Sequence, residues 1–236
     1  MERNLRVLAE LARVCSPLLR DFYLAGGTAL ALQVRHRVSE DLDFFSVRPL
    51  LRLPAGRVRD GLGVFGEEAR RVAARPRQED WLVRGVRVTF VAYGFPPVYP
   101  LVDTRRFDPS LAGLKVASPQ EIAVMKAFAL GRRARVRDYY DLYVLFGRGL
   151  ADLGETVRRA AEKYREDREP LFSPKLFLEQ LMHPEDAVGD PEGELCVPDG
   201  VRIDLAEMGA FFRDLTARYL AAVGGAGRRE GRGFGC

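Results

Sequence analysis

The stretch Ser-Glu-Asp-Leu-Asp-Phe-Phe-Ser at residues 39–46 decides how the rest of this chain is interpreted. Successive side chains of a strand point to opposite faces, so Leu42 and Phe44 should face one side and Asp41 and Asp43 the other. The two aspartates then lie roughly 6.6 Å apart along the strand. Such a carboxylate pair favours a shared cation, and Mg²⁺ takes one or two carboxylates with water and phosphate oxygens. The alternative is an aspartate pair that ends an edge strand in solvent.

The residues before this strand predict a phosphate-binding turn. An apolar run at residues 22–25 stops at Gly26 and Gly27, and residues 28–34 have the pattern of a helix. Backbone N–H groups at the start of a helix can point at a phosphate, and glycine permits the conformation that such a turn needs. A Gly-Gly pair alone is usually just a turn. Followed by a strand with paired carboxylates, it predicts a phosphate site beside metal ligands.

A second polar group is predicted on two helices further along the chain. The Ser-Pro-Gln-Glu sequence at residues 118–121 is a capping box that starts a helix, and Lys126 lies beside its apolar stripe. Only four of the 37 Lys and Arg residues are lysines, which favours a specific use of this ammonium, for instance on a nucleotide phosphate. The alternative is a lysine that snorkels to water. On the next helix Asp138 and Asp141 could reach one site, or could form ordinary surface pairs such as Arg137 with Asp141.

Two blocks of this sequence resemble signatures of the AbiEii/AbiGii-type nucleotidyltransferases. The first block is Gly-Gly-Thr-Ala-Leu at residues 26–30, followed by His-Arg-x-Ser-x-Asp-Leu-Asp-Phe-Phe at residues 36–45. The second runs from Glu121 through Lys126 to Arg-Asp-Tyr-Tyr-Asp-Leu at residues 137–142. Proteins of this family are toxins of toxin–antitoxin and phage-defence systems, within the polymerase β-like nucleotidyltransferase superfamily. Both blocks occur in the order that the family has, which makes the resemblance specific.

The resemblance implies transfer of a nucleoside monophosphate from an NTP to an acceptor hydroxyl, with Mg²⁺ at Asp41 and Asp43. It places Lys126 on the triphosphate and makes Asp141 the residue that orients or deprotonates the acceptor, with Asp138 beside it. The residues expected to bind the nucleotide are Gly26, Gly27, Thr28, Arg37, Ser39 and Lys126. Members of the family modify tRNA ends, so the expected acceptor is RNA, above all tRNA, although a protein hydroxyl is an alternative. A cognate antitoxin protein is a further expected partner.

One departure from the superfamily pattern leaves other functions open. Many of these enzymes have a third carboxylate on a later strand, but the best-placed strand here, residues 87–93, has Thr89 instead. Either Asp138 or Asp141 replaces it, or the site is degenerate. The alternatives to an RNA-modifying toxin are therefore a degenerate module that binds an antitoxin or nucleic acid, and a small-molecule (antibiotic) nucleotidyltransferase. Asp103 and Asp108 are expected in a loop, with no role.

Composition agrees with a cytoplasmic protein that has an anionic partner. The chain has 236 residues, 47% of them hydrophobic, which suffices for one large or two small domains. No apolar run approaches the roughly 20 residues of a membrane span, and the N-terminus lacks a signal-peptide pattern. Three scattered cysteines suit a reducing cytosol. The net charge of +4 and the arginines at residues 35–87 and 132–137 favour a polyanion, although solvated surface charge is the ordinary explanation.

We therefore expect an α+β, nucleotidyltransferase-like fold, in which a small mixed sheet with flanking helices carries the site and a helical C-terminal part follows. The expected division is a core at residues 1–112, a helical part at 113–223 and a flexible Gly/Arg tail at 224–236. The predicted strands are 22–25, 41–45, 69–74, 81–83, 86–93 and 114–116. A tight turn at Arg84-Gly85 should join two of them, and Phe-Pro-Pro at residues 95–97 should end the sheet. The predicted helices are 5–19, 28–34, 119–130, 136–146, 152–169, 174–182 and 205–223.

Overall fold

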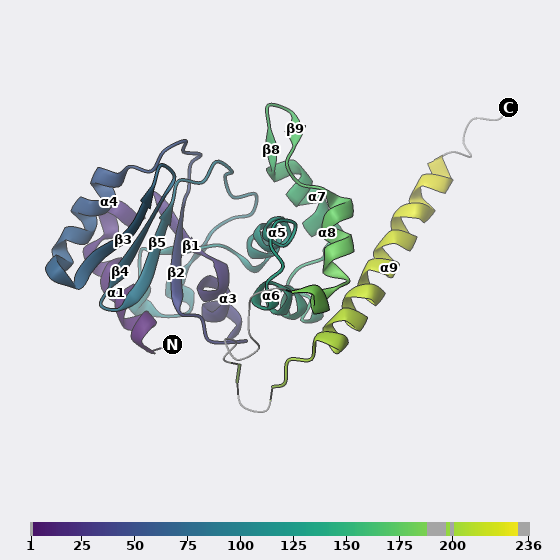
Figure 1. Cartoon of the computed structure of the whole chain (residues 1–236), viewed down its shortest axis with the longest axis horizontal. Coiled ribbons are helices and arrows are strands. Elements are labelled where there is room, and N and C mark those ends of the chain that lie inside the picture. Colours follow the sequence, from purple (N-terminus) through teal and green to yellow (C-terminus); the bar gives the residue numbers. More distant parts are fainter. Residues whose placement is uncertain (1, 188–196, 199–200, 231–236) are drawn as a thin grey trace. The chain divides into compact units, whose positions relative to one another are not determined.

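Figure 1 shows the computed structural model of the chain, which describes residues 2–187, 197–198 and 201–230. The chain packs as two compact units, Met1–Ile122 with Leu195–Gly200 and Ala123–Glu194 with Val201–Cys236. The first unit contains a mixed sheet with helices, and the described part of the second unit is mainly helical. The α+β fold class is confirmed, while the division at residues 112 and 113 stays a prediction.

The sheet of the first unit is mixed, with strand order β3-β4-β5-β2-β1-β7-β6. Strand β2 pairs in parallel with β5 and antiparallel with β1, which brings the predicted aspartate strand to the middle of the sheet. The bounds are β1 (Phe22–Ala25), β2 (Asp41–Ser46), β3 (Ala69–Arg75), β4 (Gln78–Val83), β5 (Val86–Val91), β6 (Val102–Asp103) and β7 (Lys115–Val116). The predicted turn between β4 and β5 is confirmed, with positive φ at Arg84 and Gly85.

One face of this sheet forms the core of the first unit. Leu42 and Phe44 on β2 are fully buried, as the alternation predicted, and Phe44 stacks on Phe90 of β5 with ring centroids 5.2 Å apart. Helix α1 (Glu2–Val14) packs against β2 and β5 through buried leucines such as Leu8 and Leu11. The opposite face therefore presents Asp41 and Asp43.

Several boundaries in the first unit differ from those predicted. The leading helix is divided at Cys15 into α1 and α2 (Ser16–Leu19), where Pro17 lacks the amide that would continue the helix. The Gly- and Pro-punctuated stretch at residues 49–66 contains an unpredicted helix, α4 (Ala55–Leu62), which buries Val58 and Leu62. The sheet does not end at residues 95–97: β6 was not predicted, and β7 corresponds to the strand predicted at residues 114–116. The remaining elements are α3 (Gly26–Val34) and the 3-10 helices Gly63–Glu68, Thr104–Arg106 and Pro109–Leu111.

The second unit packs its helices around α9. Helix α5 (Pro119–Leu130) begins in the first unit and continues into the second, where α6, α7 and α8 each contact α9. Phe177 and Phe212 are fully buried there. The bounds are α6 (Val136–Gly147), α7 (Leu153–Lys163), α8 (Pro174–Leu181), the 3-10 helix Pro184–Asp186 and α9 (Leu205–Glu230). No described helix combines the length and the apolar character that crossing a membrane requires.

One predicted helix of the second unit was wrong. The helix expected at residues 152–169 ends at Lys163, and a hairpin of β8 (Arg165–Glu166) and β9 (Glu169–Pro170) follows. The buried ring of Tyr164, stacked on Phe128, fixes the chain where the helix stops. Helix α9 continues through Glu230, and the flexible tail expected at residues 224–236 stays a prediction. Residues 231–236 of that predicted tail lie outside the described residues.

Candidate active site

The two glycines allow three polar side chains to approach the start of α3. Gly26 has a φ of +69°, and a Cβ atom at this residue would lie 3.1 Å from Oδ2 of Asp43. A Cβ at Gly27 would lie 2.2 Å from a guanidinium nitrogen of Arg37 and 2.9 Å from Oγ of Ser39. Only residues without a side chain permit these distances. The helix itself begins at Gly26, so the glycines form its first turn rather than a separate loop.

The hydroxyl of Thr28 holds α3 against β2. Thr28 Oγ1 donates a hydrogen bond of 2.5 Å to the backbone carbonyl of Asp41. Asn4 Nδ2 donates to the carbonyl of Ser39 at 2.8 Å, which fastens the loop between the two elements. The side chain of Thr28 thus has a role within the fold. The groups that this turn can offer a phosphate are its first backbone N–H groups, which an α-helix leaves without internal partners.

Asp41 and Asp43 form the metal-binding candidate. Both are partly exposed on the same face of β2, and Arg87 Nε lies 3.9 Å from Asp41 Oδ1. Among residues 2–187, 197–198 and 201–230, no group of three or more His, Cys, Asp or Glu side chains is arranged to hold a metal ion. Mg²⁺ binds through one or two carboxylates and completes its shell with water and substrate phosphate. The two aspartates therefore fit a magnesium site that a bound nucleotide completes.

Lys126, Asp138 and Asp141 form a buried ion-pair cluster in the second unit. Nζ of Lys126 lies 2.5 Å from Oδ1 of Asp138 and 2.7 Å from Oδ2 of Asp141. Both carboxylates are fully buried, and the lysine side chain is 9% exposed. Arg133 Nε approaches Asp138 Oδ2 at 3.3 Å as an ion pair, without the alignment of a hydrogen bond. The cluster joins α5 to α6.

This cluster overturns two of the alternatives considered from the sequence. Lys126 does not snorkel to water, because its ammonium is enclosed between two carboxylates. Asp138 and Asp141 do not form ordinary surface pairs, since neither is exposed. The burial of both ion pairs makes Lys126 part of the packing between α5 and α6.

Glu121 was noted in the sequence only as part of the capping box and of the second block. Ser118 Oγ accepts the N–H of Glu121 at 3.2 Å, as the box predicts. The glutamate side chain accepts the N–H groups of Val98 and Tyr99 at 2.9 and 3.0 Å. Burial, and then the charge of Glu121, raises the pKa of Tyr23 well above its ordinary value. Glu121 therefore holds the segment after β5, a role that needs tertiary contacts to be seen.

The structure assembles the predicted residues within each unit. In the first unit, Gly26, Gly27, Arg37, Ser39 and Asp43 converge at the start of α3. In the second, Asp138 and Asp141 meet at Lys126. Asp103 and Asp108, which were given no role, cap short 3-10 helices, and hydrogen bonds from Arg105 lower the pKa of Asp103.

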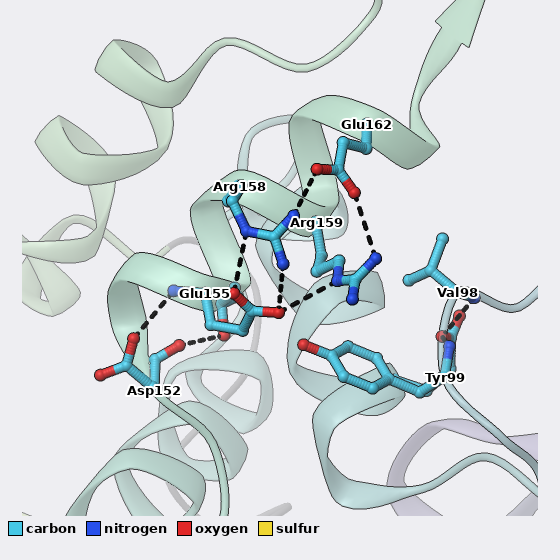
Figure 2. Close-up of polar contacts among 9 residues, drawn as sticks. Val98, Tyr99, Asp152, Glu155, Arg158, Arg159 and Glu162 are labelled. Carbon is cyan, nitrogen blue, oxygen red and sulfur yellow. Dashed lines mark hydrogen bonds and ion pairs between the residues drawn. The ribbon is translucent and has the colours of Figure 1, made fainter.

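The exposed arginines of α7 are matched by acidic neighbours. Figure 2 shows Arg158 bonded to Glu155 and Glu162, and Arg159 bonded to the same two glutamates. Asp152 caps the helix through the N–H of Glu155 at 2.8 Å. Exposed pairs of this kind contribute little stability, because water screens both charges. The arginines of α7 therefore do not amount to a basic surface.

Comparison with known proteins agrees with this fold. The family model described as "Nucleotidyl transferase AbiEii toxin, Type IV TA system" matches residues 6–192. Uncharacterized protein aq_aa25 of Aquifex aeolicus (strain VF5) is 34% identical over 153 residues, which are 63% of this chain and 68% of the relative.

One solved structure shares this fold. MenT4, a nucleotidyltransferase toxin from Mycobacterium tuberculosis H37Rv, is similar with a TM-score of 0.55 and 19% identity, over 89% of this chain and 82% of that chain. A putative nucleotidyltransferase from H. pylori has a TM-score of 0.49 and 16% identity, over 92% and 96% of the two chains. At these identities the likeness to MenT4 shows a shared fold alone. The family match, which covers most of the chain, shows that this protein belongs to the AbiEii nucleotidyltransferase toxins of type IV toxin–antitoxin systems.

Proposed function

We propose that this toxin transfers a nucleoside monophosphate from an NTP to a hydroxyl of RNA, above all tRNA, with Mg²⁺ bound at Asp41 and Asp43. The observation that carries the proposal is the arrangement at the start of α3. There an aspartate oxygen, a guanidinium and a hydroxyl approach the two glycines that form the first turn of α3. An anionic triphosphate with its cation suits this combination of donors and carboxylates.

The chemistry is an in-line displacement at the α-phosphorus. The acceptor oxygen forms a new bond to that phosphorus, the bond to the bridging oxygen breaks, and pyrophosphate leaves. Bound Mg²⁺ would neutralise charge on the triphosphate and the leaving group. The first-turn N–H groups of Gly26, Gly27 and Thr28 would hold the β- and γ-phosphates. Arg37 and Ser39 would add a charge and a hydroxyl to the same phosphates.

The cluster in the second unit has a proposed role of its own. Asp138 and Asp141 hold the ammonium of Lys126 in one place, and that fixed charge is proposed to meet the triphosphate. Asp141 is proposed to orient the acceptor hydroxyl or take its proton. Since Asp141 is fully buried, this step requires the carboxylate to become accessible when the acceptor binds.

Some of the binding partners of this protein are implied by its family. Membership of a type IV toxin–antitoxin family implies an antitoxin partner and an NTP substrate. The RNA acceptor and a cytoplasmic location are our proposals, and they rest on the sequence resemblance, on the charge balance and on the scattered cysteines.

A second candidate function is a degenerate module that binds an antitoxin or nucleic acid without catalysis. Two observations favour it. Thr89 stands beside Asp43 in the neighbouring strand, where a third carboxylate would be expected. Lys126 is already neutralised by two carboxylates. A small-molecule nucleotidyltransferase would share the proposed chemistry and differ in the acceptor.

The experiment that separates these functions is an incorporation screen. Purified protein is incubated with each α-labelled NTP, Mg²⁺ and total RNA, and the products are resolved on a gel. Label in an RNA band supports the proposed function, whereas label in a small molecule supports the antibiotic-type enzyme. No label, together with no heat of NTP binding at millimolar nucleotide and Mg²⁺, would establish the degenerate module.

A further inference from the structure

The face of the sheet that carries Asp41 and Asp43 has a continuous polar row. Asp43 of β2 pairs with Thr89 of β5, and Thr89 pairs with Asp80 of β4. Directly paired residues on neighbouring strands project to the same face. The side chains of Asp43, Thr89 and Asp80 therefore follow one another across three strands, on the side opposite the apolar core.

Asp80 fixes the hydroxyl of Thr89. Thr89 Oγ1 donates to Asp80 Oδ1 at 3.2 Å, and Gln78 Nε2 donates to the same oxygen at 2.8 Å. Thr89 and Asp80 are 6% and 7% exposed. Arg75 lies 3.7 Å from Oδ2 of Asp80, so this buried carboxylate keeps a positive neighbour. A hydroxyl has a single proton, so with that proton on Asp80 the oxygen of Thr89 can only accept from any further partner.

The neighbouring Glu79 shows what a purely structural carboxylate looks like in this strand. It points to the opposite face, where it accepts from Trp81 Nε1 at 3.0 Å and from Arg71 at 3.0 Å. On β5, Glu79 pairs with Phe90, so it does not belong to the row formed by Asp43, Thr89 and Asp80. It therefore provides a matched control for Asp80, one residue away and also buried.

We propose that Thr89 and Asp80 are positioning residues of the cation site at Asp41 and Asp43. The oxygen of Thr89 accepts a hydrogen bond from a water on the cation, and Asp80 orients that oxygen and adds negative charge to the face. Neighbouring strands lie about 4.8 Å apart, so Thr89 is adjacent to Asp43 while Asp80, two strands away, is too distant to be a ligand. This inference rests on the proposed function, because it requires the cation site.

The test measures binding of Mn²⁺ alone to the full chain by electron paramagnetic resonance, with no nucleotide and no turnover. Residues that orient the partners of a bound metal typically change its affinity 10- to 100-fold. We expect Thr89→Val and Asp80→Asn each to weaken Mn²⁺ binding about tenfold. The double variant should lose less affinity than the two single losses combined, because Asp80 acts in part through the hydroxyl that Thr89→Val removes. Thr89→Ser, which keeps the hydroxyl, should bind like the parent.

The controls separate this inference from the proposed function and from misfolding. Asp43→Asn should lose Mn²⁺ binding, which reports the site itself. Glu79→Gln should lower the melting temperature while it leaves Mn²⁺ affinity unchanged. If Asp43→Asn loses binding while Thr89→Val and Asp80→Asn bind like the parent, the positioning role is refuted and the cation site stands. If the parent binds no more Mn²⁺ than Asp43→Asn does, both the cation site and the positioning role are refuted.

Discussion

Oδ2 of Asp43 lies so close to Gly26 that a Cβ atom on this glycine would be only 3.1 Å from it. The contact joins the first turn of α3 to the strand that carries the paired aspartates. Because the φ of Gly26 is +69°, both the conformation and the space at this residue require glycine. The backbone conformation at Gly26 therefore allows the glycine turn to lie close to Asp43.

The first prediction concerns this glycine. Gly26→Ala should lower the free energy of unfolding by about 1–2 kcal/mol, because an alanine in the left-handed region is strained. It should also reduce nucleotide transfer at least about tenfold, since a misplacement near 1 Å can cost more than that. Urea denaturation and the incorporation assay measure the two effects. Gly56→Ala is the control: that position in α4 has open space, and alanine there should add about 0.5 kcal/mol. Equal activity of Gly26→Ala and the parent would contradict the role of the turn.

The second prediction concerns the buried lysine. Lys126→Ala leaves Asp138 and Asp141 buried without their shared cation, which should cost about 3–5 kcal/mol of unfolding free energy. Lys175→Ala, at an exposed pair with Glu179, should change stability by less than about 0.5 kcal/mol. Chemical denaturation compares the two variants. A Lys126→Ala protein as stable as Lys175→Ala would show that the cluster contributes nothing to folding.

The third prediction concerns Cys15. Burial, and then the charge of Glu10, raises the pKa of this thiol from 9.0 to about 11, so the neutral form is favoured in the folded protein. Folding stability from this thiol is complete below pH 9 and falls as the pH rises toward 11. In a Cys196→Ser, Cys236→Ser variant, alkylation at pH 8.5 should be about 100-fold slower than in urea, following the thiolate fraction. Equal rates in the folded and unfolded states would contradict the burial.

Strands and the hairpin could be predicted because their signals are local. The alternation around Asp41 and Asp43 defined β2, and the turn at Arg84-Gly85 defined the β4–β5 pair. The same turn also fixes the register that places Asp80 opposite Thr89, because paired residues lie equally far from it on the two strands.

Features that depend on tertiary contacts could not be predicted in this way. Whether Lys126 reaches water or a carboxylate depends on how α6 packs beside α5, which no spacing within α5 reveals. Helix α4 has only two buried residues and an unfavourable composition, so its existence depends on the contacts that it makes with its neighbours. The end of α7 is likewise fixed by the stacking of Tyr164 on Phe128.

The fourth prediction concerns the acceptor. If RNA is held by arginines such as those at residues 35, 132, 133 and 135, transfer should fall at least about tenfold between low and moderate salt as counterions compete. NTP binding alone should fall less, because it involves fewer phosphate contacts. Transfer rates and calorimetry across a salt series compare the two. A flat salt dependence, or strong transfer without RNA, would instead favour a small-molecule or self-modifying enzyme.

The most direct test of the central claim is nucleotide transfer by Asp43→Asn. The amide keeps the shape of the side chain but removes the charge that Mg²⁺ requires, so transfer should be abolished while the melting temperature is not lowered. Asp103→Asn is the matched control, an exposed aspartate that only pairs with Arg105 and caps a 3-10 helix, and it should transfer like the parent. Loss of transfer in Asp43→Asn alone is the predicted result. Equal transfer rates in Asp43→Asn and the parent would contradict the account.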